Sequence, residues 1–169
     1  MIERYRVTAE RIRQELAALE RVAARATRAM ARAFEQPGDQ DLYLDSVALN
    51  LQDFYTGAER AFRRIAGTVD EEVPAGHNWH GELLRQMAQE RTGIRPAVIS
   101  SETLDALDQY LRFRHVVRNI YTFEFDPDRI GRLVEGLSSC FRRLQLELQA
   151  FALFLDRLAE SDEGVPEGG

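Results

Sequence analysis

Apolar residues recur every three to four positions along most of the chain, which is the spacing of amphipathic helices. From residue 2 to 34 they form an unbroken heptad stripe, which Pro37 and Gly38 interrupt. The same period resumes over about residues 41–66. The pattern predicts two long helices joined by a short turn. The stripe of the first helix consists of Tyr5, Ala9, Ile12, Leu16, Leu19, Ala23, Ala26, Met30 and Ala33.

The middle of the chain is less regular. Residues 67–78 are acidic and contain proline and glycine, which predicts a loop, followed by a short helix over about residues 79–92. Ser100 or Ser101 can cap a third long helix, which we expect to run to about Thr122.

Asp126 and Pro127 are typical of a helix start, because aspartate caps well and proline suits the first helical position. The apolar period then continues to about residue 158, and residues 161–169 are glycine, proline and acid. No strand pattern competes. We predict an all-α protein, an up-and-down bundle of four long helices and one short helix, with a single domain over residues 1–160 and a disordered acidic tail.

The amino-acid composition excludes some kinds of catalysis and of binding surface. All 22 basic residues are arginine, so a lysine nucleophile or Schiff base is excluded. The net charge of −6 argues against a surface that coats nucleic acid broadly, so any RNA contact must be local. We expect a cytoplasmic protein without a membrane segment. The single cysteine, Cys140, falls at an apolar helical position and is read as a buried thiol.

The densest polar chemistry lies in the segment Tyr110–Tyr121. If this segment is helical, five polar residues share one arc of about 160°. They are Arg114, His115, Arg118, Asn119 and Tyr121. Arginines four residues apart repel each other on an isolated helix, so Arg114 and Arg118 suggest an anion between them, with a phosphodiester as the candidate. The alternative is a solvated face paired with acidic neighbours. Arg112 adds to the local positive charge.

Four stretches together resemble the HepT-like members of the HEPN superfamily: Asn50–Arg60, Asn78–Leu84, Arg95–Ser100 and Tyr110–Tyr121. These relatives are all-helical ribonuclease toxins encoded beside a minimal nucleotidyltransferase antitoxin. The resemblance covers about residues 1–160. It implies a homodimer, an RNA substrate, the nucleotidyltransferase as partner, and cleavage without a metal or other cofactor.

The motif of this family is arginine, four residues, histidine, one residue, tyrosine. Arg114 and Tyr121 take the outer positions, but Asn119 stands in the histidine position. Asparagine can orient a substrate but cannot carry a proton near neutral pH. His115, one turn earlier on the expected face, is a candidate substitute. The resemblance implies that Arg114 steadies charge on the phosphate. Arg118 and Arg112 are candidate substrate contacts because, with Arg114, they supply the densest local positive charge outside the first helix.

Other residues receive roles by the same resemblance or by position. Tyr121 can stack on a base, and in the family this tyrosine is where the antitoxin attaches AMP. Glu59 can pair with Arg114 or Arg118 across the bundle. His77 and His80 lack a third metal ligand and are read as structural. Because Asn119 puts catalysis in question, the alternative is an inactive domain that binds RNA or nucleotide, or docks a nucleotidyltransferase.

Overall fold

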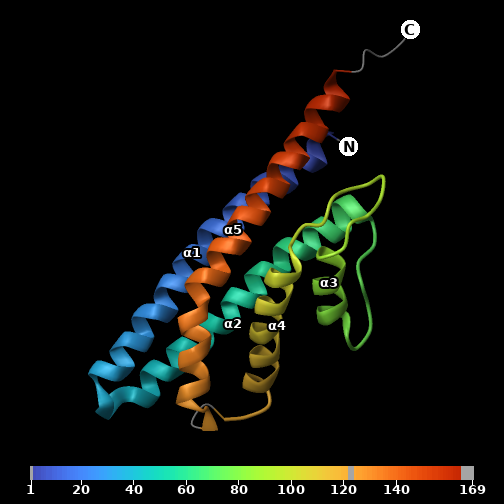
Figure 1. Ribbon diagram of the computed structural model, residues 1–169. Coiled ribbons are helices and arrows are strands. Elements are labelled where there is room, and N and C mark those ends of the chain that lie inside the picture. The colour runs from blue at the N-terminus through green and yellow to red at the C-terminus, as the bar shows by residue number, and fades with distance from the viewer. Residues whose placement is uncertain (1, 122–123, 165–169) are drawn as a thin grey trace.

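The computed structural model describes residues 2–121 and 124–164, and this part of the chain is built from helices without a strand (Figure 1). The long helices are α1 (Ile2–Glu35), α2 (Gln40–Ile65), α4 (Ser101–Val117) and α5 (Pro127–Glu163), and α3 (Trp79–Met87) is short. The prediction of an all-α bundle of four long helices and one short helix is confirmed. None of the described helices is both long and apolar enough to cross a membrane.

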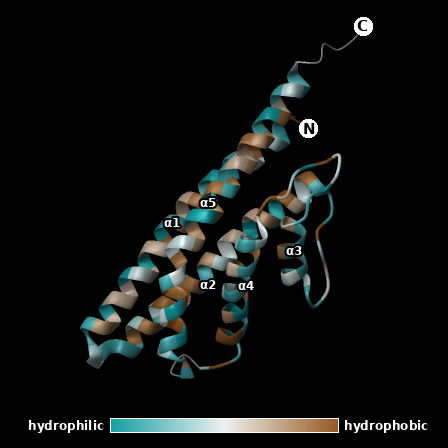
Figure 2. Ribbon diagram, viewed as in Figure 1, coloured by the Kyte–Doolittle hydropathy of each residue, from teal (hydrophilic) through white to brown (hydrophobic). Residues whose placement is uncertain are grey.

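The core follows the predicted apolar stripes. Eight of the nine stripe positions of α1 are buried, and Tyr5 packs against the core from a half-buried position. Helices α1 and α5 run side by side over much of their length, with α2 against α1 (Figure 1). Apolar residues recur among polar ones along these helices, as expected for a helix with one buried face (Figure 2).

Gly57 lies where side chains of α1 pack tightly against α2. A Cβ atom built on Gly57 would lie 2.6 Å from Cδ2 of Leu19 and 2.9 Å from Oε1 of Glu15. Any larger residue would therefore require the side chains of Leu19 and Glu15 to shift. This close packing fixes the face that α2 turns toward α1, and with it the face left for α3 and α4.

A buried ion pair anchors the connection from α2 to α4. The guanidinium of Arg95 donates to both carboxylate oxygens of Asp70, at 2.5 Å and 2.8 Å, and both side chains are fully buried. Nε2 of Gln86, on α3, donates to the same carboxylate at 2.7 Å. Because a buried charge is tolerated only when it is paired and hydrogen-bonded, this network holds α3 in one position.

Two helices end earlier than predicted. Helix α3 ends at Met87 and not near residue 92, because the chain folds back and the backbone N–H groups of Val98 and Ile99 donate to the Met87 carbonyl. Helix α4 ends at Val117 and not near Thr122, which itself lies outside the described residues. The side chain of Asn119 donates to the carbonyl oxygen of His115 at 2.6 Å and so satisfies a helix-end acceptor.

The last helix ends later than predicted. Helix α5 continues to Glu163, whose carboxylate pairs with Arg6 of α1 at 2.6 Å. The first residues of the expected tail are therefore helical, and its residues 165–169 lie outside the described part. The single domain over residues 1–160 stays a prediction.

Candidate functional site

Three helices bring one arginine, one glutamate and one histidine into contact. Arg114 of α4 lies beside Glu59 of α2, with Nη2 at 3.2 Å from Oε2 and Nη1 at 3.3 Å from Oε1. Nδ1 of His80, in the first turn of α3, lies 2.7 Å from Oε2 of Glu59 and 2.8 Å from Nη2 of Arg114. We call Glu59, His80 and Arg114 the ionic cluster.

The ionic cluster is buried on one side and open on the other. Only 4% of the Arg114 side chain and 7% of the Glu59 side chain are exposed, whereas 28% of the His80 side chain is. The imidazole is therefore the member of the cluster that a solute can reach directly.

Neighbouring side chains hold the guanidinium in place. The ring of Tyr55, one turn before Glu59 on α2, lies under Arg114 with 4.8 Å between the guanidinium carbon and the ring centre. Oγ1 of Thr56 accepts a hydrogen bond from Nη1 of Arg114 at 3.1 Å. Burial raises the pKa of the Tyr55 hydroxyl, so this tyrosine stays neutral beside Glu59. Arg114 is thus packed as well as charge-paired.

The imidazole of His80 stacks against a neighbouring aromatic ring. The ring of Trp79 lies against it with 3.6 Å between ring centres and 31° between the planes. The guanidinium of Arg63 lies over the Trp79 ring at 4.9 Å. This stack leaves the edges of the imidazole, which carry its two nitrogens, for hydrogen bonding.

The predicted pairing of Glu59 with Arg114 is confirmed, but the predicted polar face is wrong for Arg114. We expected this arginine on an exposed arc with His115, and the structure buries Arg114 while His115 is exposed. The reason is that α3 and α2 both cover the side of α4 that carries Arg114, which the pattern of α4 alone does not reveal.

The remaining motif residues lie around the end of α4 and do not join the ionic cluster. Arg118 and Asn119 are in the turn that follows the helix, and the Tyr121 side chain is 70% exposed. Among the described residues, no side-chain hydrogen bond or ion pair links Arg118 or Asn119 to Arg114, although the backbone N–H of Arg118 donates to the Arg114 carbonyl at 3.3 Å. Arg112 is exposed and pairs with Asp108 on its own helix at 2.8 Å. The expectation that one helical arc carries all these residues is therefore wrong beyond Val117.

The contact of His80 with Glu59 was not expected from the sequence, which gave His77 and His80 the same structural role. His77 is exposed in the loop, whereas His80 belongs to the ionic cluster. A signal was available, because His80 lies in the Asn78–Leu84 stretch that carries part of the family resemblance. Spacing alone did not connect it to Glu59, which lies 21 residues earlier on another helix.

Leucines of α4 that share the side of the helix predicted for the motif arginines pack within the chain. Leu107 is fully buried, and Leu104 and Leu111 pack against the core from half-buried positions. They provide no uncovered apolar surface that would require a second subunit. A homodimer stays a prediction that rests on the family resemblance.

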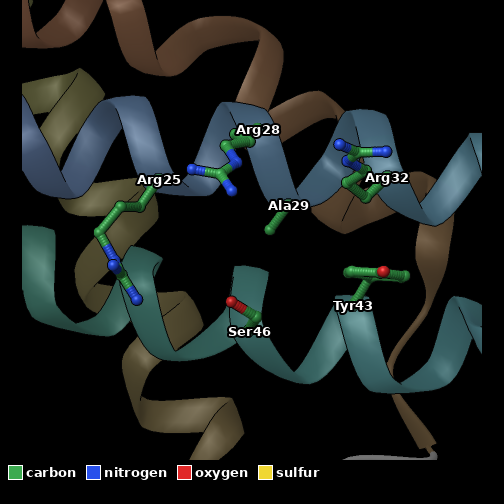
Figure 3. Close-up of a pocket in the computed structure, with 6 residues that line it drawn as sticks. All are labelled: Arg25, Arg28, Ala29, Arg32, Tyr43 and Ser46. Carbon is green, nitrogen blue, oxygen red and sulfur yellow. The ribbon is translucent and has the colours of Figure 1, made fainter.

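A second charged surface lies away from the ionic cluster, between α1 and α2 (Figure 3). Arg25, Arg28 and Arg32 line it from α1, and Tyr43 and Ser46 face them from α2. We call this hollow of about 510 Å³ the arginine groove. Arg32 pairs with Glu35 at 3.3 Å, but no acidic residue lines the groove itself among the described residues.

A comparison with known families identifies the family of this chain. The model of a family described as HepT-like protein matches residues 46–155, which is more than half of the chain. The chain therefore belongs to the HepT-like family. The match begins within α2 and ends within α5, so it contains all three members of the ionic cluster. No curated protein and no solved structure matches the chain.

Proposed function

We propose that this HepT-like protein is a toxin-type endoribonuclease that cleaves RNA without a metal ion. The ionic cluster carries the proposal, because it combines a fixed positive charge, a carboxylate and a solvent-reachable imidazole in one place. Cleavage by the RNA 2′-hydroxyl needs charge stabilisation at phosphorus and a group that moves a proton. Membership of the HepT-like family supports this chemistry over a purely structural role for the cluster.

The exposed residues at the end of α4 are proposed as the substrate surface. Arg118 and Arg112 would contact phosphates, and Asn119 would orient the RNA by hydrogen bonds. Tyr121 would stack on a base and would also be the residue to which a minimal nucleotidyltransferase antitoxin adds AMP. Modification there would place negative charge beside the arginines and compete with the RNA phosphates.

The arginine groove supports a polyanionic substrate on separate grounds. It concentrates positive charge on a chain whose net charge is −6, and the ring of Tyr43 lies beside it. Arginine combined with an aromatic ring is a common surface for single-stranded nucleic acid. We propose that longer RNAs reach this groove while shorter ones contact only the end of α4.

A second candidate function is supported by one observation. Arg114 is almost entirely buried and already paired, which suits a structural role as well as a catalytic one. The protein would then be an inactive member of the family that binds RNA or nucleotide, or docks a nucleotidyltransferase. The two candidate functions, ribonuclease and inactive family member, differ in whether the protein breaks a phosphodiester bond of RNA.

The test is cleavage of a panel of end-labelled single-stranded RNAs in the presence of EDTA. We expect products with a 2′,3′-cyclic phosphate and a 5′-hydroxyl, and strong loss of cleavage in Arg114→Gln. Arg143→Gln is the matched control, because Arg143 is a partly exposed arginine that pairs with Glu102 at 3.7 Å. RNA binding without cleavage on every substrate would favour the second candidate.

A further inference from the structure

The position of the proton on His80 is decided by its two neighbours. Nδ1 can either carry a hydrogen and donate to Glu59, or offer its lone pair to an N–H of Arg114. It cannot do both, although the two distances are 2.7 Å and 2.8 Å. The arginine always carries its hydrogens, so the choice depends on which partner lacks alternatives.

Glu59 is the partner that needs the hydrogen. Its carboxylate is 7% exposed, and Arg114 and His80 are the donors that reach it among the described residues. Arg114, in contrast, has both oxygens of Glu59 and the hydroxyl of Thr56 as acceptors. An unprotonated Nδ1 would bring its lone pair against the Oε2 lone pairs of Glu59 at 2.7 Å, so the favoured arrangement places the proton on Nδ1 of His80.

A proton on Nδ1 leaves Nε2 of the neutral imidazole as a lone pair. Among the described residues no hydrogen bond to Nε2 is present, and the side chain is partly open to solvent. A carboxylate that holds one imidazole nitrogen while the other faces a substrate is the arrangement of a general base. The Trp79 ring keeps the imidazole from turning this nitrogen away.

We propose that His80 is the proton acceptor for RNA cleavage, the role that Asn119 cannot fill. Nε2 takes the proton of the 2′-hydroxyl, and the 2′-oxygen bonds to the adjacent phosphorus. The bond from phosphorus to the 5′-oxygen breaks, and that oxygen takes a proton from water. His80 then returns its proton to solvent, so the products are a 2′,3′-cyclic phosphate and a 5′-hydroxyl. Glu59 positions the imidazole and stabilises the positive charge that it gains with the proton. This inference rests on the proposed ribonuclease function.

The chain holds three histidines, which makes a matched experiment simple. His80→Asn keeps a side-chain amide near the position of Nδ1 but removes the proton carrier, and His80→Gln is a second variant in case the first does not fold. His77→Asn is the matched control, because His77 lies at an exposed position in the loop before α3. Cleavage rates at saturating enzyme, RNA affinity by fluorescence anisotropy, and circular dichroism are measured for each variant.

We expect His80→Asn to lower the cleavage rate by about 10²–10⁴-fold, with RNA affinity and helicity unchanged. A rate near that of the natural chain in both His80 variants would overturn the role of His80 and leave the ribonuclease function standing. Absence of cleavage in the natural chain would overturn both.

The tautomer is measured independently of activity. Nitrogen-15 NMR of the histidine rings should show that the neutral form of His80 carries its hydrogen on Nδ1, whereas free histidine prefers Nε2. Glu59→Gln should weaken this preference. A hydrogen on Nε2 of neutral His80 in the natural chain would contradict the proposal whatever the activity assays show.

Discussion

The ionic cluster predicts a measurable coupling between Arg114 and Glu59. Removing one partner of a buried ion pair typically costs 3–5 kcal/mol, because the remaining charge is left in a poorly solvated place. With 4% and 7% of these side chains exposed, that range applies to this pair. His80 still lies 2.7 Å from Glu59 when Arg114 is removed, so we expect Arg114→Met to cost about 3 kcal/mol, at the lower end of the range.

The double-mutant cycle separates pairing from packing. Glu59→Gln should also cost about 3 kcal/mol, because the guanidinium of Arg114 then lacks its counter-charge. The double variant should cost well under the sum, with a coupling energy of about 2 kcal/mol. Each single variant should lower the melting temperature by roughly 6–12 °C in a chain of this size.

The assay is urea unfolding followed by circular dichroism at a fixed protein concentration. Arg112→Met and Asp108→Asn form the control cycle, since that pair lies on one exposed helix face and should couple by only about 0.3–0.5 kcal/mol. Single costs below about 1 kcal/mol for Arg114→Met and Glu59→Gln, with an unchanged slope against urea, would refute the burial argument.

Three further predictions follow from other parts of the structure. Replacing both Arg25 and Arg28 by Gln should weaken binding of long single-stranded RNA, and the slope of log K against log salt concentration should become shallower by about 1.4. The control Arg157→Gln should change neither quantity, and an equal effect of the control would argue against the arginine groove. Co-expression with an adjacent nucleotidyltransferase should add the mass of AMP to the natural chain but not to Tyr121→Phe, and a mass gain in both would place the modification elsewhere. Burial raises the pKa of the Cys140 thiol to about 12, so the folded state keeps a proton that the unfolded chain loses above about pH 9. The stabilisation from Cys140 is therefore complete below pH 9 and is lost as pH rises toward 12, and Cys140→Ala should make the fall in unfolding free energy shallower by up to about 1.4 kcal/mol per pH unit.

The helices of this protein were predictable because helix formation and apolar spacing are local properties. The stripe of α1 is buried where the heptad pattern placed it, and α5 begins at Pro127, where Asp126 caps it. The ends of α3 and α4 were less predictable. They depend on which backbone donors return to the last carbonyls, such as those of Val98 and Ile99 at Met87.

The candidate site was predictable only in part. Arg114 could be identified from the family motif, and Glu59 could be predicted as a possible ion-pair partner although the two residues are 55 positions apart. The sequence pattern placed Arg114 with His115 and Asn119 on one exposed arc, because a helical wheel assumes that the helix continues and that one face stays uncovered. Helix α4 ends at Val117, and α2 and α3 cover the arginine.

The amino-acid sequence by itself therefore determined the helical class, the positions of the long helices and the family, since all three depend on residue types at short spacings. The tertiary structure decided which ionisable side chains meet. His80 joins Glu59 and Arg114 only because α3 packs across α2 and α4, with Asp70 and Arg95 anchoring its approach. Contacts between helices depend on crossing angles and on the depth of each side chain, which no single helical pattern contains.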